Sequence, residues 1–189
     1  MIRIGWIGCG THAGEMLLPQ LVRLPVRLAA ICDTNPQRLQ LIGDRYGVTA
    51  RFADAEALIA HPDLDAIGMA VGPAQHAALA ASALARGLPV FVEKPPAATA
   101  AAAAQLAEVA ARAGKPCVVG FMKRYSTANR IAFNVLNENL GPRASLLGEY
   151  MTAPTYFAKD PDYTGFLLHH CVHAMDLSLI HISEPTRPY

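Results

Sequence analysis

The first residues of the chain, "MIRIGWIGCGTHAG", constrain its fold more than any other stretch. An apolar, isoleucine-rich run at 2–8 predicts a buried strand, and Gly8, Gly10 and Ala13 follow it with the G-x-G-x-x-A spacing. Gly8 permits a tight turn, Gly10 lets a pyrophosphate approach the backbone, and Ala13 lets the next helix pack closely. The N-terminus of that helix would direct N–H groups toward the phosphates, so the pattern predicts a dinucleotide site. The other predicted cofactor-binding residues of this loop are Cys9, Thr11 and His12.

The second predicted strand, at 26–33, ends in an acidic residue. Asp33 lies 23 residues beyond Gly10 (33 − 10), near the offset of about 20 expected for an acid that binds the ribose. A carboxylate there accepts from ribose hydroxyls and repels a 2′-phosphate, which favours NAD over NADP. Two alternatives stay open. Asp33 could serve only as a cap for the helix at Pro36, and the nearby Arg38 could bind the phosphate of NADP.

Strands and helices alternate along the first 122 residues. The further predicted strands are 64–71, 89–93 and 116–121. The helices between the strands carry ordinary boundary signals. These signals are Asn35 and Pro36 before Gly47, Gly87 after "AQHAALAASALARG", and Thr99 before Gly114. The first helix runs to about Arg23, with an expected kink at Pro19. Such βαβ units predict an α/β Rossmann domain with a doubly wound parallel sheet over 1–122.

From about Lys123 the alternation changes. A helix at 126–139 leads to a longer strand-like segment at 142–153, with no crossover helix after it. We therefore predict a domain boundary near residue 122 and the start of a second α/β domain at 123–176.

The strand at 89–93 runs into "EKPPA". In a doubly wound sheet, ligands bind beyond the carboxyl ends of the strands. Lys94 would then face the nicotinamide end of the cofactor, where partial burial lowers a lysine pKa and makes the amine a usable proton donor.

Five motifs occur together in a known order: "GWIGCG", "CDTNP", His76 before "ALARG", "VFVEKP" and "GKPCVVGFMKRY". Over about 2–176 the chain resembles the glucose–fructose oxidoreductase, inositol dehydrogenase and rhizopine-catabolism (Gfo/Idh/MocA) family. Glu-Lys-Pro behind a Rossmann fingerprint is the most specific part of the resemblance. Members are mostly NAD(P)-dependent oxidoreductases of sugars, polyols and related molecules, and many are oligomeric.

The resemblance carries further residues to the cofactor site. It implies Lys94 as the motif lysine near substrate and nicotinamide, with Pro95 shaping the turn through a cis bond. Many members have Thr-Pro where this chain has "VGP", and that pair lines the nicotinamide ribose. His76 is equally well explained as an ordinary helix residue. The residues expected at this end of the cofactor are Ala70, Val71, Gly72, His76, Glu93, Lys94 and Pro95.

The resemblance implies that the domain starting at 123–176 serves substrate binding and oligomerisation. In the family this second domain carries a helix with the pattern acid-x-x-x-His-x-x-Asp. Here His173 and Asp176 match the pattern, and His169 stands where an aspartate is common. At i, i+4 and i+7 the three share one helix face. The resemblance implies that His173 takes a hydroxyl proton, Lys94 polarises the oxygen and a hydride passes to nicotinamide. A zinc site using His169, His173 and Cys171 would lack a fourth ligand, so we expect no metal.

The last residues, 177–189, depart from the family. Leu177 to Arg187 can be written back, codon by codon, as the transposase adapter of sequencing libraries. We expect a non-native tail, which is excluded from fold reasoning, and a natural protein that is longer. The fragment itself is expected to be inactive.

Charge and composition limit the partners. The net charge is +1 and the chain is 52% hydrophobic and 16% charged, which gives no electrostatic reason to expect nucleic acid or an anionic membrane. No apolar run approaches the roughly 20 residues of a membrane span. Four scattered cysteines predict free thiols and a cytoplasmic protein.

We therefore expect an oxidoreductase that uses NAD, or NADP in its place, and that acts on a carbohydrate-like molecule as a homo-oligomer when full length. Two alternatives stay open: glycoside cleavage by redox-elimination, in which the cofactor is used transiently, and a non-catalytic dinucleotide-binding sensor or subunit.

Overall fold

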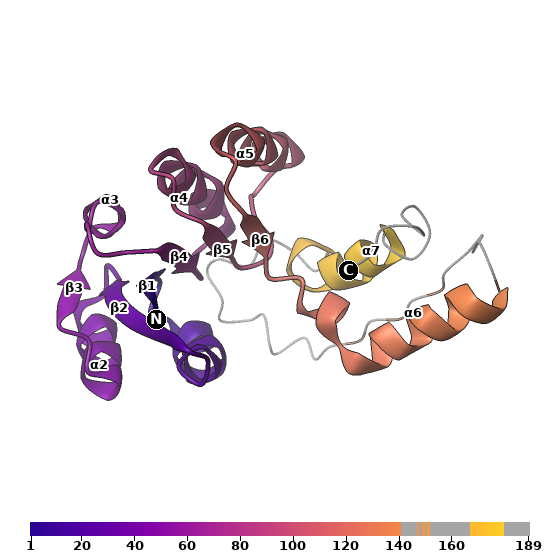
Figure 1. Cartoon of the computed structure of the whole chain (residues 1–189), viewed down its shortest axis with the longest axis horizontal. Helices are drawn as coiled ribbons and strands as arrows, with labels where there is room; N and C mark the ends of the chain where they lie inside the picture. The colour runs from indigo at the N-terminus through magenta and orange to yellow at the C-terminus, as the bar shows by residue number, and fades with distance from the viewer. Residues whose placement is uncertain (141–146, 148, 150, 152–166, 180–189) are drawn as a thin grey trace. The chain divides into compact units, whose positions relative to one another are not determined.

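The computed structural model describes residues 1–140, 147, 149, 151 and 167–179 (Figure 1). The chain divides into two compact units, Met1–Gly120 and Phe121–Tyr189, and each is described by itself.

The first unit is built on a six-stranded sheet. Its strands are β1 Ile2–Ile7, β2 Val26–Cys32, β3 Ala50–Phe52, β4 Ala66–Met69, β5 Val90–Val92 and β6 Cys117–Val119. Every neighbouring pair is parallel and the order is β3-β2-β1-β4-β5-β6. This order confirms the predicted doubly wound α/β fold, and it reverses direction between β1 and β4, where such sheets bind their ligand.

Helices cover both faces of this sheet (Figure 1). The helices are η1 Ala13–Leu17, α1 Leu18–Leu21, α2 Pro36–Tyr46, α3 Ala55–Ile59, α4 Pro73–Ala85 and α5 Ala100–Ala113. One core packs α3, α4 and α5 against the sheet through residues such as Leu58, Leu84 and Leu106. A second core, around Trp6 and Ile31, packs α1 and α2 against the other face. The glycine turn lies at the edge of this second core, which fixes its position relative to the sheet.

The predicted helix boundaries have physical causes that the structure makes visible. The side chain of Asn35 accepts hydrogen bonds from the backbone N–H groups of Gln37 and Arg38, and Thr99 caps α5 in the same way. Gly47 and Gly114 end their helices in the left-handed region, with φ of 66° and 60°.

The first helix departs from a regular α-helix, as Pro19 predicts. Its turns at Ala13–Leu17 are π-helical, and the N–H of Leu18 donates to the carbonyl of Ala13, five residues back. A second such bond to Gly14 is not available, because Pro19 has no N–H. The Gly14 carbonyl instead accepts from Arg45 Nη1 at 3.3 Å, so α2 satisfies a backbone group that the proline leaves open.

Two short elements between 48 and 63 have no counterpart in the sequence prediction. Strand β3 has three residues and α3 has five, which is too short for hydrophobic periodicity to appear. The cap of α3 was nevertheless present in the sequence, because the side chain of Asp54 accepts from the N–H of Ala57 at 2.8 Å.

The second unit contains four described helical segments: η2 Met122–Tyr125, α6 Thr127–Leu140, η4 Leu167–Cys171 and α7 Val172–Ser178. The helix predicted at 126–139 is present as α6. The strand-like segment predicted at 142–153 and most of the proposed tail fall outside the described residues, apart from 147, 149, 151 and 177–179. In the described part of the chain, no helix has the length and apolar character that crossing a membrane requires.

Candidate dinucleotide and catalytic site

Backbone hydrogen bonds bring the carboxyl ends of four strands together in the first unit. The N–H of Gly8 donates to Cys32 O at 2.8 Å, that of Ala70 to Ile7 O at 2.9 Å, and that of Glu93 to Met69 O at 3.0 Å. The turns that follow β1, β4 and β5 are therefore neighbours along one edge of the sheet. The predicted cofactor residues of this unit gather at this edge.

The glycine turn has the geometry that its spacing predicts. Gly8 has φ of +93°, a backbone conformation that residues with a side chain rarely adopt. A Cβ added to it would also overlap the carbonyl oxygen of Ala70, so both backbone conformation and lack of space require glycine here. A Cβ on Gly10 would have Arg38 Nη1 as its nearest neighbour, at 3.6 Å. The surface above Gly10 is thus open to a ligand. Ala13 is buried against the sheet, as the third position of the fingerprint requires.

Trp6 supports this turn from below. Its indole Nε1–H donates to the carbonyl of Gly8 at 2.8 Å, and its ring stacks on Phe91 with centroids 6.2 Å apart. Gly68 in the next strand leaves room for the ring, which a Cβ there would overlap. The chain contains one tryptophan, so its fluorescence reports on the glycine turn.

Asp33 binds the glycine turn directly. Oδ2 accepts from the N–H of Cys9 at 2.7 Å, and Oδ1 accepts from the N–H of Asn35 at 2.7 Å. The helix cap itself is Asn35, so Asp33 is not merely a cap. Each carboxylate oxygen keeps a second lone pair for a ribose hydroxyl. Arg38 is exposed on α2 and lies beside Gly10, where a 2′-phosphate would need a cation.

The two cysteines near this turn are poorly suited to chemistry. Burial, reinforced by the charge of Asp33, raises the pKa of the Cys9 thiol to about 12 and that of Cys32 to about 11. The thiolate is the reactive form, so both side chains act as small apolar core groups. All four cysteines are free thiols in the structure.

The turn after β5 carries a buried carboxylate next to the motif lysine. Glu93 is 9% exposed, and its Oε2 accepts from the N–H of Lys94 at 2.9 Å. Its Oε1 lies 3.8 Å from Nε2 of His12 in the glycine loop. The Lys94–Pro95 peptide bond is cis, the conformation that the resemblance implied. Burial lowers the pKa of the Lys94 amine, and the nearby Glu93 opposes that shift.

His76 uses both ring nitrogens within the protein. Nε2 lies 3.1 Å from the N–H of Val71, and Nδ1 lies 2.8 Å from the carbonyl oxygen of Pro95. With an exposure of 1%, the imidazole joins the turns after β4 and β5 from beneath. Gly72 is the N-cap of α4 and has an extended conformation, and it follows Ala70 and Val71 at the end of β4.

The predicted catalytic helix forms a cluster of its own in the second unit. Asp176, 5% exposed, accepts from Arg124 Nε at 2.7 Å, and a second bond from Arg124 Nη2 makes the pair bidentate. His173 is buried and packs edge-on against Phe121, with ring centroids 6.4 Å apart. His169 is part of η4, and its side chain lies outside the described part of the structure.

The structure therefore assembles the predicted residues in two groups. The cofactor set and Lys94 lie in the first unit, while His173 and Asp176 lie in the second. That Lys94 and His173 act on one substrate stays a prediction.

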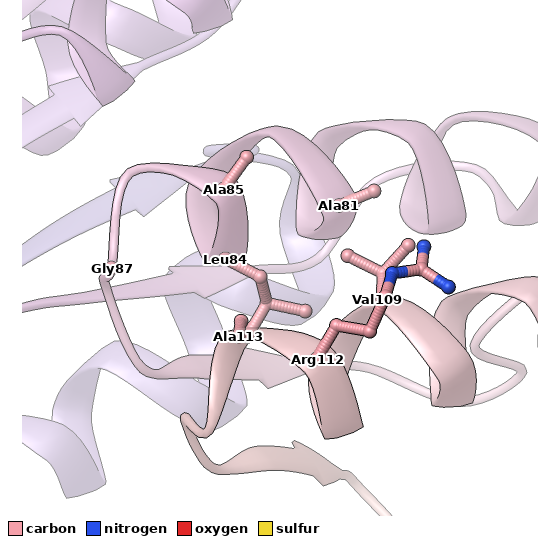
Figure 2. A pocket seen from close by; sticks show the side chains of 7 residues that line it. All are labelled: Ala81, Leu84, Ala85, Gly87, Val109, Arg112 and Ala113. Atoms are coloured by element: carbon pink, nitrogen blue, oxygen red, sulfur yellow. The ribbon is translucent and has the colours of Figure 1, made fainter.

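A groove between α4 and α5 is separate from these residues (Figure 2). Apolar side chains of both helices line it, including Leu84 and Val109, with Arg112 at one side. Gly87, which precedes β5, also lines it. The groove thus extends to the amino ends of the strands, opposite the glycine turn.

Sequence reasoning missed two residues that support the site. A Cβ on Gly120 would lie 2.8 Å from Glu93 Oε1, so this glycine makes room for the buried carboxylate. Arg124 neutralises Asp176. A buried aspartate signals the need for a cation, but the sequence does not show which of sixteen lysines and arginines supplies it.

Comparison with known proteins also indicates an NAD-binding Rossmann domain. A family model described as "Oxidoreductase family, NAD-binding Rossmann fold" (GFO_IDH_MocA) matches residues 2–121. An inositol 2-dehydrogenase from Acidothermus cellulolyticus is 35% identical over 132 residues, which are 67% of this chain and 38% of that protein. A D-apiose dehydrogenase from Rhizobium rhizogenes is 37% identical over 89 residues, 47% of this chain and 26% of that protein. The chain thus spans well under half the length of these curated relatives.

Solved structures share the fold. A scyllo-inositol dehydrogenase from Lactobacillus casei, solved with NAD(H) and scyllo-inositol, superposes with a TM-score of 0.83 at 21% identity and covers 97% of this chain and 56% of that one. A 3-ketoreductase from Actinomadura kijaniata, solved with NADP and TDP-benzene, has a TM-score of 0.67 at 29% identity, over 72% of this chain and 42% of that one.

Proposed function

Because the chain belongs to the Gfo/Idh/MocA family of oxidoreductases with an NAD-binding Rossmann fold, we propose that the whole protein is a nicotinamide-dependent dehydrogenase of a sugar, polyol or related small molecule. The family assignment confirms the resemblance seen in the sequence motifs. The observation that carries the proposal is the shared edge of the sheet. There the open backbone at Gly10, the ribose acid Asp33 and the half-buried Lys94 follow β1, β2 and β5.

NAD is the cofactor that this edge favours. Asp33 accepts from two backbone N–H groups, which hold its carboxylate where ribose hydroxyls would bind and a 2′-phosphate would be repelled. When bound, nicotinamide supplies the hydride acceptor. Arg38 provides a cation beside the same turn, which supports weaker use of NADP.

The chain's own residues would handle the proton and the orientation of the substrate. Lys94, whose pKa burial lowers, donates a hydrogen bond to the substrate oxygen and polarises it. His173 accepts the hydroxyl proton as the C–H bond breaks. Asp176 is already bound by Arg124 in a bidentate pair, so its role is to hold α7 rather than to move protons. His169 would complete the same helix face.

Relatives with "inositol 2-dehydrogenase" and "D-apiose dehydrogenase" as names support a polyol or carbohydrate substrate. We also infer that the whole protein is a cytoplasmic homo-oligomer. The four free thiols suit a reducing compartment.

The test uses the whole protein. NADH formation is followed with a panel of cyclic polyols and aldoses. Lys94→Ala and His173→Ala are expected to lower kcat by about 100-fold or more while NADH still binds. Lys115→Ala, which removes a lysine preceding β6 at the other edge of the sheet, is the matched control.

Each outcome separates the candidates. Product release without net NADH would favour redox-elimination. If both variants keep full turnover, the catalytic assignment is wrong. If no substrate turns over although NADH binds, the sensor alternative replaces the enzyme.

A further inference from the structure

His76 is a buried titratable group that the proposed chemistry does not use. It lies in the first full turn of α4, its side chain is almost completely buried, and its two nitrogens contact two different turns. Val71 follows β4 and Pro95 follows β5, and these strands are paired in the sheet. The imidazole therefore spans the gap between two strand ends at the cofactor edge.

The partners of the ring determine its protonation. The backbone N–H of Val71 can only donate, so Nε2 at 3.1 Å must carry a lone pair. The carbonyl of Pro95 can only accept, so Nδ1 at 2.8 Å must carry the proton. One tautomer of the neutral ring, with hydrogen on Nδ1, satisfies both contacts, and the other neutral form satisfies neither.

We propose that His76 is a positioning residue: in its neutral Nδ1–H form it ties the turn at Val71 to the cis Lys94–Pro95 turn and so sets where Lys94 and the backbone of 70–72 meet the cofactor. The importance of Lys94 rests on the proposed function, whereas the two contacts of the ring do not. Lys94 follows the three-residue strand β5, so its place at the cofactor edge depends on the turn that His76 contacts through Pro95.

A charged ring would break this arrangement. Protonation of Nε2 would point its N–H at the N–H of Val71, and the bond would be lost. Burial lowers the pKa of His76, against the opposing effects of the Pro95 bond and of Glu93. The charged neighbours on the β5 turn are Glu93 and Lys94.

The charged side chains of α3 and α5 that lie next to α4 contact groups other than His76. On α3, Glu56 accepts from Ser82 in the second half of α4. On α5, Arg112 pairs with Glu108 and lines the groove together with Ala81 of α4 (Figure 2). Glu93 is thus the anion that acts on the ring.

The first measurement reads the tautomer without any ligand. Long-range proton–nitrogen NMR spectra of the 15N-labelled 189-residue chain resolve which ring nitrogen carries hydrogen, and the His76→Gln variant assigns the signal. We expect a single Nδ1–H tautomer that stays neutral below pH 6.5, the ordinary pKa of histidine. An Nε2–H tautomer, or a ring that charges at its ordinary pKa, would overturn the proposal.

The second measurement tests the hydrogen bonds of His76 to Val71 and to Pro95 separately. Asparagine places its amide near the position of Nδ1 and glutamine places its oxygen near that of Nε2, so His76→Asn keeps the Pro95 bond and His76→Gln keeps the Val71 bond. His76→Leu removes both. Amide hydrogen exchange at Val71 should quicken in the Asn and Leu variants and stay slow in the Gln variant.

The affinity for NADH should follow the same order. We expect the Leu variant to bind NADH about tenfold more weakly than the wild-type chain, and the Asn and Gln variants to lie between. His61→Gln is the matched control, since His61 precedes β4 at the opposite edge and accepts from Asp63 N–H. Equal affinity in all His76 variants would refute the positioning role. If the wild-type chain binds no NADH, the proposed function fails, while the tautomer and Val71 exchange still decide the contact.

Discussion

Single residues at the glycine turn show how much of the site the sequence could predict. The roles of Gly8, Gly10 and Ala13 follow from backbone geometry and the size of a side chain, and those properties depend on local chain alone. The partners of His76 did not follow, because Val71 and Pro95 meet it only after the sheet has formed. Gly120 was missed for the same reason, since the carboxylate of Glu93 reaches it from the end of the neighbouring strand β5.

The charges of Asp33 and Arg38 predict the choice of dinucleotide. Asp33→Ala removes the acceptor for the ribose and the bond to Cys9 N–H, so NADH affinity should fall about tenfold or more while NADPH is affected less. Arg38→Ala should weaken the binding of NADPH and leave the affinity for NADH nearly unchanged. Titration of both variants with both dinucleotides checks this. A loss of NADH affinity in Arg38→Ala as large as in Asp33→Ala would contradict the assignment.

For helices and strands, the length of the element determined whether the sequence could predict it. Helices with a cap and a stop, such as α2 and α5, were predicted because their signals are local. The three-residue β3 and five-residue α3 carry too few residues for a period to appear. The π-helical turn before Pro19 was foreseen only as a kink. Its compensation by Arg45 depends on α2 packing beside it.

The bond between η2 and α7 gives a prediction at this scale. Arg124→Ala leaves the buried Asp176 without its bidentate partner, which should destabilise the packing of α7 by up to about 3 kcal/mol. Amide hydrogen exchange over 172–178 should quicken, and exchange in β1 and β4 should not change. Asp176→Asn, which keeps the shape, should have a smaller effect. Unchanged exchange in α7 of the Arg124→Ala variant would show that the pair does not hold the helix.

For the whole molecule, the division at Gly120 and Phe121 lies close to the boundary that the change of pattern near residue 122 predicts. The sheet order followed from alternating strands and helices, because a right-handed crossover leaves few ways to build a parallel sheet. The second unit could not be derived in this way, since its described helices carry no such repeated pattern.

Two buried or paired groups predict how stability depends on pH. The folded-state pKa of His76 is lowered from 6.5. The neutral ring therefore contributes fully to the free energy of unfolding above pH 6.5, and this contribution is lost as the pH falls toward the folded-state pKa. The ion pair with Arg3 lowers the pKa of Asp65 from 3.8 to about 2. The stabilisation from this pair is therefore lost only as the pH falls from 3.8 to about 2. The free energy of unfolding should therefore begin to fall below pH 6.5. In His76→Gln this first decline should be smaller, as measured by urea denaturation from pH 7.5 to 4.5.

The central claim is that a dinucleotide lies against bare backbone at Gly10. Energy transfer from Trp6, which donates to the carbonyl of Gly8, reports NADH binding to the 189-residue chain and to Gly10→Ala. The added methyl group has 3.6 Å to its nearest neighbour, so the variant should unfold at the same temperature as the wild-type chain. We predict saturable NADH binding by the wild-type chain and its loss in Gly10→Ala. Equal binding by both proteins, or no saturable binding by the wild-type chain, would contradict the account.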